Sequence, residues 1–369
     1  MAELTNISLS RGAPSLDIIA VEDLRAAAQG ALQRDPGGML AYGTSAGYPR
    51  LLEWLSKHHD VDPKRLLATN GSMQADAFLF QELVEPGDVV VVEAPTYDRT
   101  LLSLTKLGAE ILAIPLEADG IDVGALEAAL EEGARPTLAH IIPNFQNPAG
   151  CTLSLDKRHR LLALAHEYGF TIFEDDPYVA LRFEGEQHPT MMELDEGGDA
   201  VVYASSFSKT VAPGIRVGYL VGDEELIAAV RKRATETYIS PNMVAQAIVA
   251  EFCDSGAIDR SIATVKKALR ERRDATCAAL DRHLPDARYV TPEGGYFLWV
   301  DLPEGTDVNA LAAGAAERGV VFEKGTGFMI EGGESSLRLA YSAVPPDQIE
   351  EGVARIAEAY RELHAPARA

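Results

Sequence analysis

The chain has 369 residues, of which 47% are hydrophobic, and it carries a formal net charge of −23 at pH 7. This composition is typical of a globular protein with two domains, and no run approaches the ~20 apolar residues of a membrane-spanning helix. So much negative charge disfavours binding to nucleic acid or to anionic membranes. Any site for an anionic ligand must therefore be built from local positive charge.

The first 30 or so residues show no regular apolar period, and we expect them to be irregular. Between residues 64 and 222, short apolar runs alternate with helix-like segments. The runs are almost continuously apolar, as strands buried on both faces should be. We predict a doubly wound α/β fold with a mostly parallel sheet of seven strands. The runs are 65–70, 88–94, 109–116, 137–143, 170–176, 200–206 and 216–222.

The pattern changes after about residue 255. A long helical stretch covers roughly 257–284, and shorter strand and helix patterns follow it, which together predict a smaller α+β domain. We therefore divide the chain into an N-terminal segment that docks on the small domain (1–35), a large domain (36–255) and a small C-terminal domain (256–369).

Polar residues follow the carboxyl ends of several predicted strands. In an open α/β sheet, ligands bind beyond these ends. A Gly-Ser turn that opens a helix follows the first strand, and such a turn suits phosphate because its backbone N–H groups are free. The polar side chains at the strand ends are Ser72, Tyr97, Asn147, Asp175, Tyr178, Ser206, Ser208 and Lys209.

These residue types suggest one chemistry. Lys209 follows a buried strand, and burial lowers the pKa of an amine and makes it a good Schiff-base nucleophile. Arg216, seven residues later, offers a guanidinium fork for a phosphate. Asp175 could bind a protonated ring nitrogen, as pyridoxal phosphate requires. Asn147 and Tyr178 could hydrogen-bond the phenolic oxygen of the same ring.

Three motifs, "NFQNPAG", "FEDDPY" and "SSFSKTVAPGIRVGY", occur in this order along the chain. Together they resemble the fold-type I pyridoxal-phosphate aminotransferases of class I and II. The chain looks most similar to the α-aminoadipate and kynurenine aminotransferase subgroup, and it also resembles the catalytic half of winged-helix regulators fused to an aminotransferase domain. Further matches are "AYGTSAGYPRL", "TNGSMQA", "EAPTYD", "PEGGYFLWVDLP" and "SLRLAYS".

The resemblance implies a role for each matched position. Lys209 forms the Schiff base and moves the substrate proton, and Asp175, rather than its neighbour Asp176, pairs with the ring nitrogen. Asn147 and Tyr178 hold the ring oxygen. The phosphate is held by hydroxyls, the Met73 backbone and a guanidinium: Ser72, Met73, Ser206, Ser208 and Arg216.

Three further positions extend the implied site. Tyr97 stacks on the cofactor ring, and Arg338 binds the α-carboxylate of the substrate, with Asn147 beside it. Tyr42 resembles the tyrosine that reaches the phosphate in a neighbouring subunit, which implies a homodimer with shared active sites.

The chain also departs from the family pattern. Arg11 stands where many relatives have a small residue, Met73 where a glutamine is common, and Lys324 in a segment that often begins Pro-Gly. Arg11 and the 324–330 loop border the expected place of the substrate side chain. Arg11 suits a dicarboxylic donor such as 2-aminoadipate or glutamate, but an aromatic or large aliphatic donor is equally consistent with the subgroup.

We predict an aminotransferase that moves an amino group from an L-amino acid to a 2-oxo acid by a ping-pong mechanism. A lyase, decarboxylase or racemase would share the whole cofactor site. A ligand-binding regulatory domain is disfavoured, because such regulators carry a DNA-binding winged helix and the charge here is strongly negative. We expect no metal site, because the histidines lack ligand spacing. The three cysteines without C-x-x-C spacing and the absence of a secretory signal predict a cytoplasmic protein.

Overall fold

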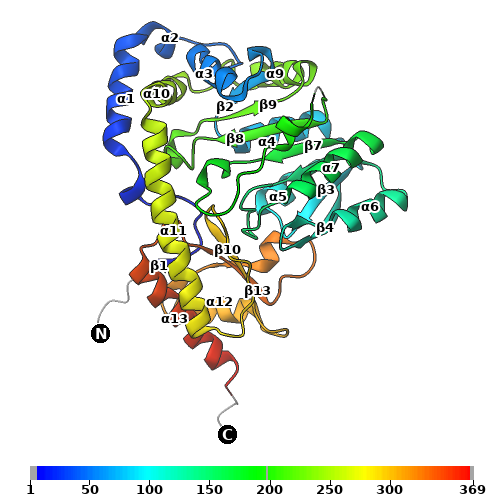
Figure 1. The fold of residues 1–369 in the computed structure, drawn as a ribbon, viewed down its shortest axis with the longest axis vertical. Coiled ribbons are helices and arrows are strands. Elements are labelled where there is room, and N and C mark those ends of the chain that lie inside the picture. Colours follow the sequence, from blue (N-terminus) through cyan, green and yellow to red (C-terminus); the bar gives the residue numbers. More distant parts are fainter. Residues whose placement is uncertain (1–5, 197, 366–369) are drawn as a thin grey trace.

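The computed structural model describes residues 6–196 and 198–365, and its largest feature is an eight-stranded sheet (Figure 1). Seven strands confirm those predicted between residues 64 and 222. The eighth, β5, has only two residues, too few to form a recognisable run. The strands are β2 (Leu66–Thr69), β3 (Val89–Ala94), β4 (Glu110–Glu117), β5 (Gly120–Ile121), β6 (Pro136–Ile141), β7 (Thr171–Asp175), β8 (Val201–Ser206) and β9 (Gly218–Val221).

The strand order in this sheet is β2-β9-β8-β7-β6-β3-β4-β5. Strands β8, β7, β6, β3 and β4 pair in parallel, whereas β9 and β5 run antiparallel to their neighbours. The sheet is thus mostly parallel, as predicted. Because parallel strands end at one edge, the segments that follow β6, β7 and β8 lie side by side.

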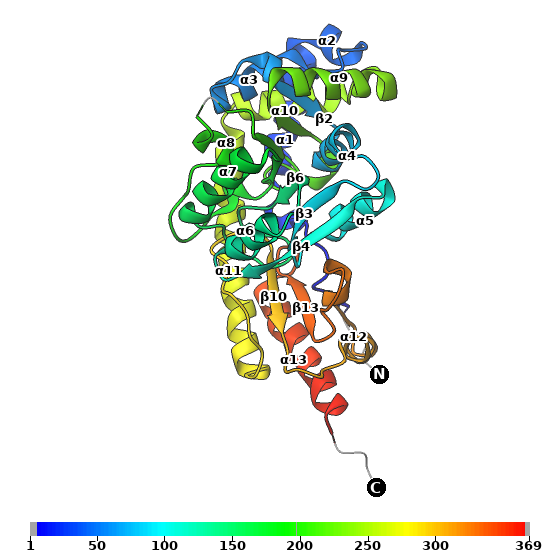
Figure 2. The ribbon, with the colours of Figure 1, turned by 90° about the vertical axis from the view of Figure 1, so that its right-hand side faces the viewer.

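Helices cover both faces of the sheet (Figures 1 and 2). On β3, Val90 and Val92 pack in one buried cluster and Val91 packs in another. This burial on both faces explains why the predicted strands are continuously apolar. The first cluster includes α4 (Ser72–Leu83), α5 (Asp98–Leu107) and α9 (Glu224–Tyr238), and the second includes α6 (Val123–Glu131), α7 (Leu155–Tyr168) and α8 (Met191–Leu194).

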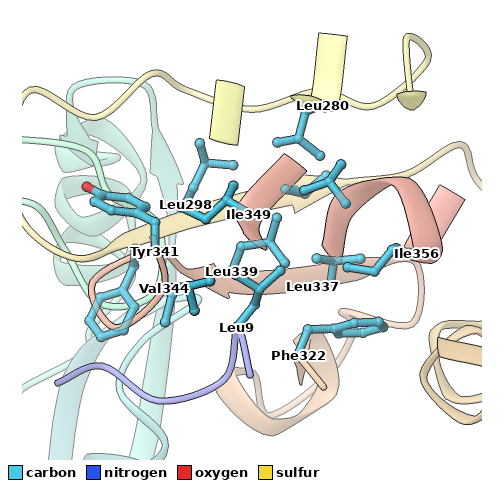
Figure 3. Close-up of a cluster of buried hydrophobic side chains, with 14 of the residues drawn as sticks. Leu9, Leu280, Leu298, Phe322, Leu337, Leu339, Tyr341, Val344, Ile349 and Ile356 are labelled. Carbon is cyan, nitrogen blue, oxygen red and sulfur yellow. The ribbon is translucent and has the colours of Figure 1, made fainter. Parts of the chain in front are cut away.

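The C-terminal part contains a smaller sheet with helices, as predicted. Its antiparallel sheet has the order β10-β13-β12, formed by β10 (Phe297–Asp301), β13 (Ser336–Ala340) and β12 (Glu323–Lys324). Figure 3 shows Leu280, Leu298 and Ile356 in the cluster that joins this sheet to the helices. The helices here are α11 (Ala257–His283), α12 (Val308–Glu317) and α13 (Pro346–Leu363).

The N-terminal segment contacts both parts of the molecule. Strand β1 (Ile7–Ser8) pairs with β11 (Val320–Val321), and Leu9 enters the C-terminal core (Figure 3). Farther on, α1 (Val21–Arg34) packs against α10 (Met243–Asp254).

The expectation that the first 30 or so residues are irregular is therefore wrong from Val21 onward. Helix α1 has a narrow buried face built from alanines such as Ala27 and Ala31, which give a weak apolar period. The domain limits at residues 35 and 255 remain predictions. The other helices near this region are α2 (Pro36–Leu40) and α3 (Pro49–His59). No helix in the described ranges is both long and apolar enough to cross a membrane.

Candidate active site

A cavity of about 510 Å³ lies between the carboxyl edge of the large sheet and the C-terminal part. It collects side chains that are far apart in the chain, because neighbouring parallel strands end there. Twelve of the thirteen predicted site residues line it: Arg11, Ser72, Met73, Tyr97, Asn147, Asp175, Tyr178, Ser206, Ser208, Lys209, Arg216 and Arg338.

Tyr42 is the exception. Its side chain is 87% exposed and does not line the cavity of its own chain. Within one chain, the structure therefore does not bring Tyr42 to the other predicted residues.

Lys209 lies in the turn that follows β8. Its Nζ donates a 2.8 Å hydrogen bond to the carbonyl of Gly12 and lies over the rings of Tyr178 and Tyr296. Burial lowers the pKa of Lys209 to about 8, and the charges of Arg216 and Arg338 add to this effect. An amine with such a pKa is partly neutral at physiological pH, as a nucleophile must be.

Two serines and an arginine form a compact cluster beside Lys209. Ser206 Oγ donates to Ser208 Oγ at 2.9 Å, and Arg216 Nη1 donates to Ser208 Oγ at 3.1 Å. Arg216 lies against Gly71, which has a φ of 84° and directly precedes α4. A side chain at Gly71 would collide with the Arg216 guanidinium. The guanidinium therefore lies close to the free N–H groups at the start of α4, an arrangement that suits a phosphate.

Asp175 ends β7 and is buried. One of its oxygens, Oδ2, lies 3.6 Å from His140 Nε2, and the other, Oδ1, is buried without a hydrogen-bond partner among the described residues. A buried unpaired carboxylate oxygen is costly, so the site is prepared for a donor that the protein itself does not supply. A protonated ring nitrogen would be such a donor.

Arg338, on β13, is buried on the opposite side of the cavity. It donates to Asn147 Oδ1 at 2.9 Å and to the Ser10 carbonyl at 2.7 Å, whereas its Nε is buried without a partner. Burial lowers the pKa of its guanidinium. The arrangement leaves Arg338 able to bind a carboxylate.

Two tyrosines of the cavity lining, Tyr97 and Tyr178, lie in largely nonpolar surroundings, and each carries a hydroxyl group. Tyr97, which precedes α5, contacts Met73 through its hydroxyl at 3.5 Å, and burial raises its pKa to about 12. Burial also raises the pKa of Tyr178 well above its usual value. Both phenols therefore stay protonated at physiological pH and can donate hydrogen bonds.

Several residues in or next to the cavity lining were not predicted. The carbonyls of Ser10 and Gly12 contact the two key cations, and backbone carbonyls leave no mark in a sequence. His140 lies beneath Asp175, and its only signal is a lone histidine in the apolar run 137–143. Glu323, from the small sheet, accepts a 2.6 Å hydrogen bond from Ser10 Oγ.

The charge of the cavity differs in sign from that of the chain. Its lining contains five cationic residues (Arg11, Arg99, Lys209, Arg216 and Arg338) and three acidic ones (Asp98, Asp175 and Glu323). A locally positive site in a chain of net charge −23 is what an anionic ligand requires.

Comparison with known proteins agrees with this geometry. Residues 5–356 match the family described as aminotransferase class I and II. The chain belongs to this family. It is 34% identical to the aromatic-amino-acid aminotransferase 1 of Thermococcus litoralis, over 96% of this chain and 88% of the relative.

Two solved aminotransferases share the whole fold. The α-aminoadipate aminotransferase of Thermus thermophilus, complexed with N-(5'-phosphopyridoxyl)-L-leucine, has a TM-score of 0.93 and 32% identity, covering 97% of this chain and 93% of that one. The kynurenine aminotransferase of Pyrococcus horikoshii has a TM-score of 0.93 and 33% identity, covering 98% and 92%. The protein is a pyridoxal-phosphate-dependent aminotransferase whose substrates are amino acids and 2-oxo acids.

The cavity of this aminotransferase fits its cofactor. The unpartnered Oδ1 of Asp175 could accept from the protonated ring nitrogen, and Lys209 could supply the amine for the Schiff base. The cluster of Ser206, Ser208 and Arg216 beside the start of α4 could hold the phosphate.

Proposed function

We propose that this aminotransferase transfers an amino group from an L-amino acid to a 2-oxo acid in a ping-pong cycle centred on Lys209. The observation that carries the proposal is that one cavity holds both a buried amine and a buried acceptor oxygen that lacks a donor. Lys209 is an amine with a pKa of about 8, and Asp175 Oδ1 is a buried acceptor without a donor. A Schiff-base cofactor with a protonated ring nitrogen satisfies both.

The cofactor, when bound, withdraws electrons from the substrate Cα and so makes the Cα proton acidic. The Lys209 amine would anchor the cofactor in the resting enzyme. Once free, the same amine would take up the substrate Cα proton and could donate it again, which is general acid–base catalysis by one group. Asp175 keeps the ring nitrogen protonated, and its neighbour His140 holds the carboxylate in place.

The remaining residues bind and orient. Ser206, Ser208 and Arg216, together with Ser72 and the Met73 backbone N–H at the start of α4, hold the phosphate. Asn147 and Tyr178 hydrogen-bond the ring oxygen, and Tyr97 packs against the ring.

Arg338 binds the α-carboxylate of the substrate. Its unpartnered Nε and its bond to Asn147 Oδ1 support this assignment, because they place an unmet donor beside a ring-binding residue. The substrate Cα would then lie between Arg338 and Lys209.

We also propose a homodimer in which Tyr42 reaches the phosphate site of the partner subunit. The exposure of Tyr42 and of its neighbour Leu40, at 87% and 66%, supports a contact beyond the single chain. The cysteines are free thiols, Cys151 and Cys253 being buried, which supports a reducing cytoplasmic location.

A half-reaction tests the proposal. Purified holoenzyme is mixed with a panel of single L-amino acids and no 2-oxo acid, and the cofactor absorbance and the products are followed. We expect one equivalent of 2-oxo acid per site, conversion of the cofactor to its amine form, and reversal on adding a 2-oxo acid. Continuous release of pyruvate and ammonia without that conversion would instead establish elimination chemistry.

A further inference from the structure

Asn147 lies in a buried segment that belongs to no helix or strand. Residues 142–148, which follow β6, are all buried, and Phe145 among them has a φ of 51°. Backbone that is buried without regular structure must be held by other hydrogen bonds. The position of the Asn147 amide, whose Oδ1 accepts from Arg338 at 2.9 Å, therefore depends on what holds this segment.

The side chain of Gln146 anchors the segment from within. It is fully buried, and its Nε2 donates to Glu93 Oε2 at 3.0 Å and to the Pro95 carbonyl at 2.8 Å. Its Oε1 accepts from the backbone N–H of Ala149 at 2.8 Å. Both N–H donors and the oxygen of this amide are thus engaged, and together they fix the turn in which Asn147 lies.

Glu93, near the carboxyl end of β3, holds the segment at two points. Only 1% of it is exposed, and the oxygen that accepts from Gln146, Oε2, also accepts from the backbone N–H of Ile142 at 3.1 Å. Burial raises the pKa of Glu93 to about 8, so its side chain is largely a neutral acid at physiological pH. Glu93 does not line the cavity, and its hydrogen bonds lead to the segment that carries Asn147.

Glu174 offers a comparison, because it is an equally buried carboxyl group of the same sheet. Burial raises its pKa to about 7. Its oxygens accept from the backbone N–H groups of Met191 and Met192 at 2.8 and 3.0 Å, at the start of α8. Neither methionine lines the active-site cavity. The two glutamates therefore differ in what they hold rather than in how deeply they are buried.

We propose that Glu93 is a positioning residue that acts through Gln146 on Asn147. The inference rests on the proposed function, in which Asn147 hydrogen-bonds the ring oxygen of the cofactor and lies beside Arg338. Shortening the side chain by one methylene, as in E93D, withdraws the acceptor oxygen from Gln146 and lets the segment shift. A displacement of about 1 Å at a residue that orients a reacting group can lower a rate by roughly 100-fold.

A double-mutant cycle tests whether Glu93 and Asn147 act as one unit. kcat/KM is measured for one L-amino acid donor in the wild-type holoenzyme and in E93D, N147A and E93D/N147A. We expect E93D and N147A each to lower kcat/KM by roughly 10- to 100-fold, and the double variant to lie less than about 3-fold below N147A. Additive losses in the double variant, or an unchanged kcat/KM in E93D, would overturn the proposal.

Three further variants separate positioning from stability. E93Q keeps the length, an acceptor oxygen and an N–H donor in place of the acid O–H, so its kcat/KM should stay within about 3-fold of the wild type. E174D shortens the comparison residue in the same way, and it should lower the urea midpoint while kcat/KM changes by less than about 3-fold. Equal losses of activity in E93D and E174D would also overturn the proposal. If E93D does not fold, Q146L removes the same hydrogen bond from the other side and takes its place in the cycle.

The affinity of the apoproteins for pyridoxal phosphate gives a readout that needs no turnover. Absorbance titration of the four proteins of the cycle measures the dissociation constant. E93D and N147A should each weaken binding by roughly 3- to 10-fold, and the double variant should bind no more than about 2-fold more weakly than N147A. If the wild type binds the cofactor but converts no amino acid, the proposed function fails, whereas this binding cycle still decides for or against Glu93.

Discussion

Two buried charged regions lie close together in this protein. They differ in whether the hydrogen-bonding groups of their side chains have partners. Arg158, on α7, donates to the carbonyls of Leu153 and Pro189 at 3.1 and 2.9 Å, and to Asn144 Oδ1 at 3.1 Å. Glu174, on β7, accepts from the backbone N–H groups of Met191 and Met192 at 2.8 and 3.0 Å. Both side chains are fully buried, yet their hydrogen-bonding groups are paired.

The active-site cavity contains the same residue types without that pairing. Asp175 is next to Glu174 in the chain and Arg338 resembles Arg158 in burial, but Asp175 Oδ1 and Arg338 Nε have no partner. Because an unpaired buried group is costly, the first region stabilises the fold and the second is completed by a ligand. Burial and charge alone would not distinguish these two pairs of side chains. The presence or absence of hydrogen-bond partners does distinguish them.

The largest effect on activity is expected for Lys209→Ala, because this change removes the buried amine of the cavity. We expect kcat to fall by roughly 10⁴-fold or more, because both the nucleophile and the proton carrier are lost. Steady-state transamination, with far-UV circular dichroism to confirm folding, measures the effect. Multiple turnovers at an undiminished rate would refute the assignment of Lys209.

Glu174 and Asp175, which are adjacent residues on β7, allow a sharper test. Asp175→Asn should lower kcat by roughly 10²- to 10³-fold, because the ring nitrogen loses its charged partner. Glu174→Gln changes the adjacent residue in the same way but should leave kcat within about 3-fold and lower stability by about 1–3 kcal/mol. Burial already raises the pKa of Glu174 to about 7, so a neutral amide is a mild replacement there. Similar losses of activity in both variants would show that the two carboxylates do not differ in role.

The sheet was predictable because its strands are buried on both faces. Val90, Val91 and Val92 pack into two different clusters, and so the run in the sequence has no polar gaps. Helix α1 was missed because alanines form its buried face, and alanines give too weak an apolar period to mark a helix.

The place of Lys209, Asp175 and Arg338 in the cavity lining was predictable, because the types of their side chains suggest a chemistry. The sequence could not reveal that the carbonyls of Ser10 and Gly12 bind two of the cations, because any residue has a carbonyl and only the fold decides where it points. Tyr42 lies outside the cavity of its own chain, so its role in a site shared between two subunits stays a prediction.

The two arginines give the third test. Arg338→Met should lower kcat/KM by roughly 100-fold through loss of the α-carboxylate partner. Its loss of stability should be smaller than that of Arg158→Met, because the loss of two hydrogen bonds is partly offset by removal of a desolvated cation. Arg158→Met should lower stability by about 3–5 kcal/mol, because it leaves several buried oxygens without a donor and removes the cation 3.9 Å from Glu174. Urea denaturation and steady-state kinetics on both variants measure the two effects. Equal destabilisation by both changes would remove the distinction between the regions.

The smallest effect concerns pH. In the apoprotein Lys209 has a pKa of about 8, below the 10.5 of an ordinary lysine, so folding opposes its charged form. Between pH 8 and 10.5 the unfolded chain binds a proton that the folded chain does not, and stability therefore rises with pH through this window. Below pH 8 both states carry the charge and the full cost is present.

The Lys209→Met variant has no charge at this position. Comparing it with the wild type therefore isolates the effect of the Lys209 charge on stability. At pH 7 the apoprotein of this variant should be more stable than the wild type by about 1–3 kcal/mol, and the difference should shrink as the pH rises from about 8 to about 10. Urea denaturation of both apoproteins at several pH values across this window measures the difference, and Lys57→Met, at an exposed lysine paired with Glu53, is the matched control. A difference that does not change with pH would mean that Lys209 keeps an ordinary pKa, and the cavity would then lack the poised amine on which the comparison with the paired region rests.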